Sequence, residues 1–179
     1  MLLWDLDRQR SSLNWLAIRP ADRPAVSRLD APAGENGKDA KTSDWLILDT
    51  PAGLHGKNLS HAVKISDSII VPLQPSIFDM AATSDFLQAL VAEKAVRKDR
   101  TRIGVVGMRV DPRTKAAATL QAFLQQYRLP VLTYLRDTQL YANAAFNGLS
   151  IFDLPDHMKT RELELWGPLL AWLDGDNAA

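Results

Sequence analysis

The feature that most constrains the fold of this 179-residue chain is a series of short runs that are apolar at consecutive positions rather than at alternate ones. A strand with two apolar faces must be covered on both, which is typical of parallel sheets packed between helices. Each run ends beside Asp, Pro or Gly. The pattern predicts strands over Met1–Leu6, Trp45–Leu48, Ser68–Leu73 and Ile103–Val110, with Pro130–Leu135 as a candidate fifth.

Between these runs, apolar residues recur at spacings of three and four, the period of one helix face. Strands that alternate with helices predict an α/β fold: a doubly wound, mostly parallel sheet with helices on both faces. Ser76 or Asp79 is available to cap the first helix, and Gly148 follows the third. The predicted helices span Asp79–Val96, Thr114–Tyr127, Thr138–Asn147 and Thr160–Leu173.

Residues 19–42 differ from the rest in being rich in Pro, Gly, Ala and charged residues, with weak periodicity of either kind. Such a composition is typical of a loop that runs over the surface. We predict a mobile surface excursion inside a single domain of residues 1–179, because the length suits one domain with its own apolar core.

Composition narrows the classes of function. Lys plus Arg and Asp plus Glu both number 21, so the bulk charge favours neither nucleic acid nor an anionic membrane. The chain has no Cys, which excludes disulfides, thiolate catalysis and Cys-bound zinc. No apolar run approaches the roughly 20 residues that cross a bilayer, so no integral membrane contact is expected. In the absence of Cys and of a targeting or membrane segment, we expect a cytoplasmic location. The three histidines, His55, His61 and His157, are not spaced as metal ligands usually are.

Two acidic residues lie at the C-terminal end of the first predicted strand. Asp5 and Asp7 share one face of the chain because successive strand residues point in opposite directions. Ligand sites of open α/β sheets gather at the carboxyl ends of strands, so either acid is a candidate to act on a metal-bound phosphate or a water. A helix cap or a solvated acid at a strand end is the alternative interpretation.

A third acid, Asp49, ends the second strand and is followed at once by a turn with Pro51 and Gly53. Nucleotide hydrolases use an acid at this place to hold Mg²⁺ through water, and the loop after it to sense a γ-phosphate. Alone the segment is equally consistent with a simple turn, but the pairing with Asp5 and Asp7 favours the metal site.

Taken in order, several segments resemble the ParA/MinD family of partitioning and positioning ATPases, which are P-loop NTPases with a deviant Walker A loop. The strength of the resemblance lies in the ordered set, which covers nearly the whole chain. The segments are MLLWDLDRQRSSLNWL, SDWLILDTPAG (like the Walker B segment), SDSIIVPLQPSIFDMAA, VVGMRVDPRTKAAATL (like the base-binding strand) and LPVLTYLRDTQLYANAAFNGLSIFDLP.

The resemblance implies ATP and Mg²⁺ as cofactors and assigns roles by position. Asp7 corresponds to the acid that orients the attacking water near Mg²⁺, and Asp49 to the acid that holds the water shell of the metal. Many members have Asn before Arg in the base-binding strand, whereas this chain has Met108 before Arg109. The implied nucleotide contacts are Asp5, Pro51, Ala52, Gly53, Met108 and Arg109.

Family members begin with a strand and a Gly-rich loop bearing two Lys, both before the strand that here starts at Met1. Backbone N–H groups and a Lys cradle phosphate in such a loop. GENGKDA, which starts at Gly34, has the wrong spacing and Asp in place of Ser or Thr. We therefore expect a chain that lacks the first strand and P-loop helix and does not hold ATP alone, through a truncated gene, a late start codon or a cloned fragment.

The absent strand lies, in the family, between the two strands predicted at Trp45–Leu48 and Ser68–Leu73. Its loss would leave unpaired backbone groups, each costing roughly 1–3 kcal/mol if buried. We expect these strands either to pair directly or to leave exposed edges that favour association.

The resemblance also implies a homodimer, a ParB-like or cargo-adaptor partner and nonspecific DNA contacts. A solvated face is the alternative for the basic side chains. Two other functions stay open: a pseudo-ATPase module that binds partners without nucleotide, and a non-functional truncated fragment. The candidate DNA-binding residues are Arg97, Lys98, Arg100, Arg102 and Arg136.

Overall fold

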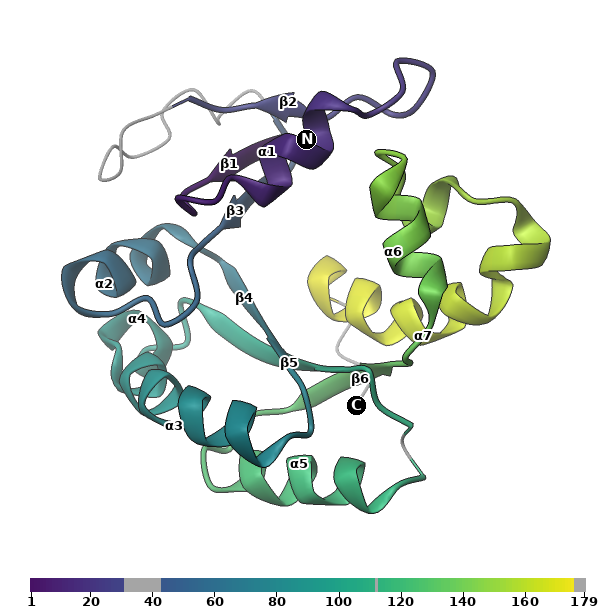
Figure 1. The fold of residues 1–179 in the computed structure, drawn as a ribbon. Helices are drawn as coiled ribbons and strands as arrows, with labels where there is room; N and C mark the ends of the chain where they lie inside the picture. The colour runs from purple at the N-terminus through teal and green to yellow at the C-terminus, as the bar shows by residue number, and fades with distance from the viewer. Residues whose placement is uncertain (31–42, 112, 176–179) are drawn as a thin grey trace. The chain divides into compact units, whose positions relative to one another are not determined.

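A computed structural model describes residues 1–30, 43–111 and 113–175 of the chain (Figure 1). The chain divides into two compact units, each built from two stretches of sequence. Unit 1 comprises Met1–Ala62 and Gln139–Pro155, and unit 2 comprises Val63–Thr138 and Asp156–Ala179. Residues 31–42, the larger part of the predicted surface excursion, lie outside the described residues.

Unit 1 contains a three-stranded parallel sheet in the order β2-β1-β3, with β1 (Leu2–Asp5) in the centre. β3 (Leu46–Asp49) pairs with β1 along its whole length. β2 (Ser27–Arg28) is a short edge strand inside the stretch predicted to be irregular, because its backbone bonds to the free side of β1. The helices are α1 (Ser11–Ala17), α2 (Gly56–Ile65, which runs on into unit 2), α6 (Gln139–Phe146) and the 3₁₀ helix η2 (Ile151–Asp153).

The two stretches of unit 1 are joined by a polar link. Arg19 donates to both carboxylate oxygens of Asp153, at 3.0 and 3.3 Å, and to the carbonyl oxygen of Gly148 at 3.1 Å. Only 9% of the Arg19 side chain and 6% of the Asp153 side chain are exposed. Trp15 adds a hydrogen bond from Nε1 to the carbonyl oxygen of Leu149 at 3.2 Å.

Asp153 is held ionised by this link. Burial by itself would raise the pKa of the carboxyl, but hydrogen bonds from Arg19 and from the N–H and Oγ of Ser150 outweigh it and lower the pKa from 3.8 to about 2. Gly148 is required at the contact because its φ is +65° and a Cβ there would lie 2.5 Å from the carbonyl oxygen of Ile18.

Unit 2 contains a second parallel sheet, in the order β4-β5-β6. Its strands are β4 (Ser68–Leu73), β5 (Arg102–Met108) and β6 (Val131–Leu135). The central β5 is buried at five consecutive residues, which is what two covered faces require. The helices are α3 (Ile77–Ala92), α4 (Lys94–Arg97), α5 (Lys115–Gln125) and α7 (Asp156–Asp174).

The helices of unit 2 cover both faces of its sheet. On one face Leu169 of α7 packs against Val106 and Leu135, and the Oγ1 of Thr133 donates to a carbonyl oxygen of α7 at 2.6 Å. α3 and α5 lie on the opposite side of the sheet (Figure 1). Ser84 of α3 forms a 2.7 Å hydrogen bond with Tyr127, two residues after the end of α5. This α/β architecture, with parallel strands and helices on both faces, confirms the predicted fold class.

The strands divide differently from the expectation of one sheet. Within the described residues β3 pairs with β1 in unit 1 and β4 pairs with β5 in unit 2, so the two strands belong to separate sheets. Direct pairing of β3 with β4 was one of the two expected alternatives, and neither sheet contains it. Each has one neighbour in its own sheet, and association through the remaining edges stays a prediction.

Helix boundaries also differ from the predicted ones. The helix predicted over Asp79–Val96 breaks at Glu93, whose extended backbone (φ −61°, ψ 139°) separates α3 from α4. α7 begins at Asp156 rather than at Thr160, directly after Pro155. α1 and α2 were not predicted. α1 has only seven residues, too few for a clear period, whereas in α2 the buried Leu59, Ala62 and Val63 do recur at spacings of three and four and were overlooked.

Candidate functional site

The site begins where two strands of unit 1 end side by side. Asp5 and Asp49 are register partners at the carboxyl ends of β1 and β3. The backbone continues this pairing for one more step, since the N–H of Leu6 donates to the carbonyl oxygen of Asp49 at 2.8 Å. The parallel register thus brings together two acids that are 44 positions apart in the sequence, at the edge where ligands of α/β sheets bind.

Asp5 acts as a cap for α1. Its Oδ2 accepts from the N–H of Leu13 at 3.2 Å, and its Oδ1 accepts from the N–H of Asp7 at 2.9 Å. The residue before the helix, Arg10, has a left-handed backbone (φ 53°) and no side-chain cap hydrogen bond. Asp5 therefore supplies an acceptor that the helix start needs, as the helix-cap interpretation proposed.

Within residues 1–30, 43–111 and 113–175, one carboxylate oxygen of Asp7 and one of Asp49 accept no hydrogen bond from a side chain or a backbone N–H. Oδ1 of Asp7 accepts from the N–H of Gln9 at 2.9 Å, and Oδ2 of Asp49 accepts from Oγ of Ser12 at 2.5 Å. Both acids are half-buried. Ser12 was missed by sequence reasoning, and its only signal was its place in the first turn of a helix directly after the acidic strand end.

The chain turns sharply in the loop that follows β3. Pro51 is half-buried, whereas Ala52 and Gly53 are exposed. Gly53 adopts φ of +69°, a conformation that a side chain would strain, and its carbonyl oxygen lies 3.0 Å from Nδ1 of His55. The loop is thus shaped by glycine, as a phosphate-sensing switch or a simple turn both require.

The base-strand candidates lie in unit 2. Met108 is the last residue of β5, and Arg109 follows it with φ of 56°. The Arg109 guanidinium forms a bidentate pair with Asp137, at 3.0 and 3.3 Å, and both side chains are well exposed. Asp137 was not anticipated from the sequence.

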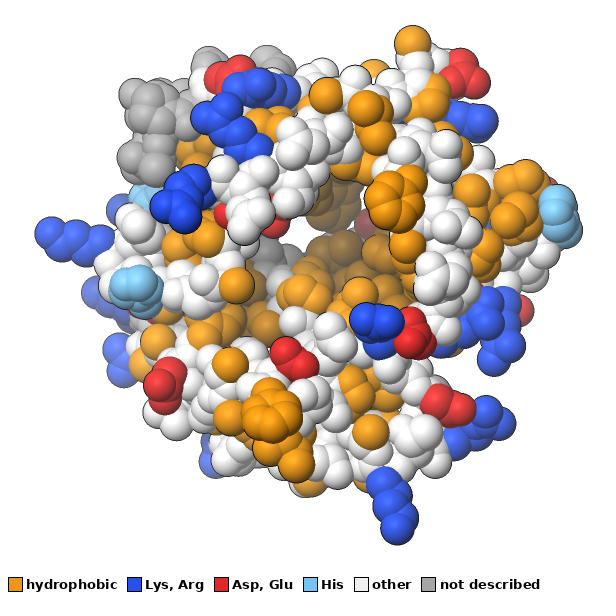
Figure 2. Space-filling model, in the orientation of Figure 1, with side chains coloured by type: hydrophobic (Ala, Val, Ile, Leu, Met, Phe, Trp, Pro, Cys, Tyr) orange, Lys and Arg blue, Asp and Glu red, His pale blue; other side chains and the backbone are white. Residues whose placement is uncertain are grey.

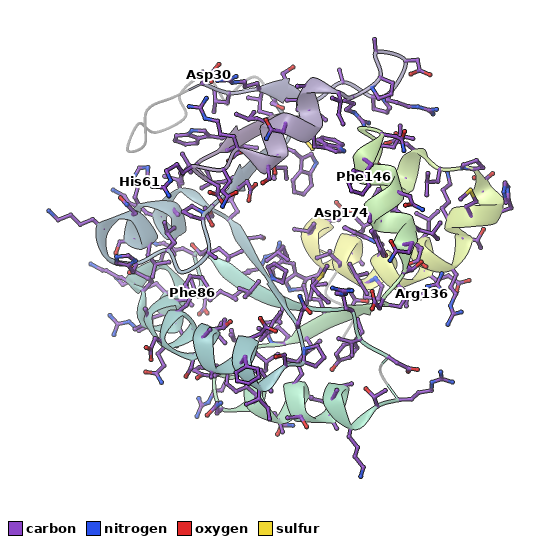
Figure 3. All side chains as sticks on the ribbon, in the orientation of Figure 1. Asp30, His61, Phe86, Arg136, Phe146 and Asp174 are labelled. Atoms are coloured by element: carbon purple, nitrogen blue, oxygen red, sulfur yellow. The ribbon has the colours of Figure 1, made fainter. Side chains whose placement is uncertain are left out.

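The basic candidates separate into two groups. Arg102 donates to the carbonyl oxygen of Trp172 at 3.0 Å and lies 4.6 Å from the centre of its ring, so it caps the end of α7. Arg136, at the end of β6 beside α7 in Figure 3, donates to the fully buried Glu162. The exposed basic side chains are Arg97, Lys98 and Arg100.

The carboxylate oxygens of Asp7 and Asp49 suit Mg²⁺ better than they suit a metal ion whose ligands all come from the protein. Among the described residues no group of three or more His, Asp or Glu side chains is placed to hold a metal ion. Mg²⁺ is usually bound by one or two carboxylates, with waters and substrate phosphates as the remaining ligands. Asp7 and Asp49, each with one oxygen available, fit this pattern. Of the described helices, none is both long and apolar enough to cross a bilayer.

Comparison with known proteins gives relatives of one kind. No family model matches the chain. The maintenance of carboxysome distribution protein A of Halothiobacillus neapolitanus is 24% identical over 112 residues, which are 62% of this chain and 51% of that protein. The protein of the same name from Gloeobacter kilaueensis is 29% identical over 108 residues, which are 59% and 48%. The chain spans about half the length of these curated relatives.

Solved structures show the fold. The MinC:MinD cell division protein complex of Aquifex aeolicus matches with a TM-score of 0.64 at 12% identity, over 95% of this chain and 82% of that one. MinD of Pyrococcus horikoshii, complexed with Mg-ADP, matches with a TM-score of 0.64 at 15% identity, over 97% and 82%. By fold and by sequence, the chain therefore resembles the ParA/MinD family of positioning ATPases, as its ordered motifs predicted.

Proposed function

We propose that this chain serves in ParA/MinD-like positioning of DNA or protein cargo, through an ATP-dependent dimer switch. The observation that carries the proposal is the juxtaposition of Asp5 and Asp49 at the carboxyl ends of paired parallel strands, with Asp7 just beyond. The similarity to proteins named for carboxysome distribution and for cell division supports positioning as the role. A homodimer and a ParB-like or cargo-adaptor partner belong to the same proposal.

The acids of unit 1 have distinct tasks in this proposal. Asp49 would hold the water shell of Mg²⁺, and Ser12 orients its carboxylate through the 2.5 Å bond. Asp7 orients the attacking water, and Asp5 holds the start of α1 in place. When bound, Mg²⁺ neutralises charge on the phosphates.

We further propose that these 179 residues do not hold ATP by themselves. Phosphate binding by this family needs backbone N–H groups and a Lys in a Gly-rich loop. GENGKDA, whose spacing does not fit, lies outside the described residues. Thermal melting of the purified chain with Mg-ATP, compared with Mg²⁺ alone, should show no shift, whereas a ligand at about 100 times its Kd would add about 2.7 kcal/mol. A clear Mg-ATP shift that Asp49→Asn removes would contradict this proposal.

The assignment of Asp7 is tested in a longer protein that carries a phosphate loop ahead of these residues. There Asp7→Ala should reduce hydrolysis far more than it reduces the melting temperature, because the residue is half-buried and acts on water. Asp44→Ala, at an exposed position before β3, is the matched control. Hydrolysis at the wild-type rate in Asp7→Ala would show that the assignment is wrong.

A second candidate function is a pseudo-ATPase module that binds partners without nucleotide. It is favoured by the internal use of the polar groups: Asp5 caps a helix, Ser12 bonds Asp49, and Arg109 pairs with Asp137. Binding of the adaptor partner by the 179-residue chain without ATP would favour this module. A strict requirement for ATP and for the longer protein would favour the switch.

DNA binding stays part of the first proposal, with a cytoplasmic, nucleoid-associated location. The three exposed cations Arg97, Lys98 and Arg100 are the ones available for phosphates, since Arg102 and Arg136 have structural partners. Changing the three to Ala should lower nonspecific DNA affinity and flatten its salt dependence. Unchanged affinity would assign them to a solvated face.

A further inference from the structure

The two residues that follow α6 are Asn147 and Gly148, a dipeptide with a chemistry of its own. Because glycine has no Cβ, its backbone nitrogen can approach the side-chain carbonyl carbon of the preceding Asn with little hindrance. Attack at that carbon closes a succinimide ring and releases ammonia, and water then opens the ring. The result is deamidation, in which a neutral amide becomes a carboxylate.

The folded chain engages both of the groups that would react. The N–H of Gly148 donates to the carbonyl oxygen of Ala145 at 3.1 Å, and Nδ2 of Asn147 donates to the carbonyl oxygen of Asn143 at 2.8 Å. The nitrogen of Gly148 must lose its proton in the reaction, and the amide of Asn147 must leave. Both hydrogen bonds therefore have to break before the attack.

The polar link of unit 1 fixes Gly148 from its other side. Its carbonyl oxygen accepts from Nη1 of Arg19 at 3.1 Å, and the same guanidinium is held by the buried Asp153. Gly148 is buried, and a Cβ built on it would lie only 2.5 Å from the carbonyl oxygen of Ile18. Gly148 can thus turn towards Asn147 only when Ile18 and Arg19 move away.

The amide that would be lost is open to solvent. Asn147 is exposed, and so is its neighbour Phe146 at the end of α6 (Figure 3). Figure 2 shows hydrophobic side chains on the surface over α6, so no other described part of unit 1 covers this helix from that side. Water can therefore reach the site. We propose that Asn147–Gly148 is a deamidation site that the Arg19–Asp153 link keeps unreactive, and that opening of the link allows the reaction.

The reaction is balanced by water alone. A bond forms between the nitrogen of Gly148 and Cγ of Asn147, the bond from Cγ to Nδ2 breaks, and the proton of the Gly148 nitrogen leaves with the ammonia. Water then adds to one of the two carbonyl carbons of the ring. Addition at Cγ gives aspartate, whereas addition at the backbone carbon gives isoaspartate, whose chain continues through Cβ and Cγ.

Either product should hinder closure of the link. Isoaspartate lengthens the backbone by one carbon directly before Gly148, at a contact that has no room even for a Cβ. Both products place a carboxylate at the C-terminus of α6, where the helix dipole disfavours an anion. The change would thus make an opening of unit 1 permanent. It involves none of the residues assigned to ATP or Mg²⁺, so the inference does not rest on the proposed function.

Incubation of the full 179-residue chain at neutral pH, followed by tryptic digestion and mass spectrometry, tests the proposal. Asn147 lies in the peptide Asp137–Lys159, and a protein isoaspartate methyltransferase with a labelled methyl donor measures the isoaspartate in it. The rate should follow the population of the open state. Arg19→Met should therefore raise it about tenfold or more, since the variant breaks a desolvated ion pair.

The matched control is Arg28→Met, because Arg28 belongs to the same unit but pairs with Asp30 on the surface. Its rate should equal that of the unchanged chain. Asn147→Gln should remove the isoaspartate signal at this position. In concentrated urea the unchanged chain, Arg19→Met and Arg28→Met should all react at one rate, faster than the unchanged chain does when folded.

A milder variant covers the case in which Arg19→Met does not fold, as thermal melting would show. Ser150→Ala removes one hydrogen bond to Asp153, at 2.7 Å, and should raise the rate by less than Arg19→Met does. The proposal would be overturned if Asn147 reacted as fast in the folded chain as in urea. It would equally be overturned if a folded Arg19→Met, or Ser150→Ala in its place, matched the rate of Arg28→Met.

Discussion

The two units of this chain are stabilised in different ways. Of the buried apolar side chains that the structure describes, fifteen belong to unit 2 and six to unit 1. Unit 1 instead joins its two stretches of sequence with the Arg19–Asp153 pair and the hydrogen bonds around it. Apolar burial is insensitive to pH and tolerant of small shifts, whereas a desolvated ion pair depends on the ionisation and geometry of both partners. The stability of unit 1, which contains the acidic site, therefore depends more on pH and on side-chain geometry than the stability of unit 2 does.

The largest expected loss of stability comes from a substitution in the apolar core of unit 2. Leu120 of α5 is fully buried, so Leu120→Ala should cost about 4 kcal/mol from lost burial and the cavity left behind. Gln121→Ala, at the exposed neighbouring position, is the control, and its free energy of unfolding should change little. Hydrogen exchange of the backbone amides, measured at increasing denaturant concentration, should show the loss of stability in β4, β5 and β6. A similar loss in both variants would contradict an apolar core centred on α5.

In the described part of unit 2 the carboxylate of Glu162 is buried, and removing its partner Arg136 gives the next effect. Arg136→Met leaves Glu162 buried without its cation, which should cost about 3 kcal/mol. The control is Arg109→Met, because the pair with Asp137 is exposed on both sides and should contribute little. Equal urea midpoints for the two variants would show that the burial of Glu162 has no energetic consequence.

Low pH should destabilise unit 1 more than unit 2. The pKa of Asp153 is about 2 in the folded chain and 3.8 ordinarily, so its contribution of about 2 kcal/mol is complete above pH 3.8 and disappears as the pH falls towards 2. Asp153→Asn should remove this contribution at neutral pH and flatten the acid dependence of unit 1, measured by amide exchange in β1 and β3.

The matched control for the acid experiment is Asp111. Hydrogen bonds from Arg113 lower the pKa of Asp111 to about 2 as well, but this pair lies on the surface. Asp111→Asn should therefore change stability little. If Asp111→Asn and Asp153→Asn behaved alike, the distinction between a buried link and a surface pair would fail.

The smallest effect concerns the candidate site. Ser12→Ala removes the hydrogen bond to Asp49 and should cost about 1 kcal/mol, since the bond is partly buried and its acceptor is charged. Ser11→Ala, one residue earlier and exposed, is the control. Urea denaturation of both variants measures the difference. No difference would mean that Asp49 finds another donor, and that Ser12 does not position it.

The sequence anticipated the elements whose cause is local. β5, which is buried on both faces, was recognisable as a continuous apolar run, and Asp49 was recognisable as an acid at the end of the apolar run of β3. β3 itself is only half-buried or exposed along its length. The break at Glu93 was not recognisable, because neighbouring residues continue the helical period on both sides. The pairing of Arg19 with Asp153 and the division of the strands between two sheets depend on contacts between distant residues, which leave no periodic trace in the sequence.

The split make-up of unit 1 has a consequence for its biosynthesis. Arg19 leaves the ribosome well before its partner Asp153, which is 134 positions later. Chains emerge at about 5–20 residues per second, so β1 and β3 wait several seconds at least for α6 and η2. Unit 2 lies between them in the sequence and has most of its strands available earlier. During translation the acidic strand ends should therefore stay incomplete until α6 and η2 have emerged, whereas unit 2 has its three strands earlier and waits only for α7.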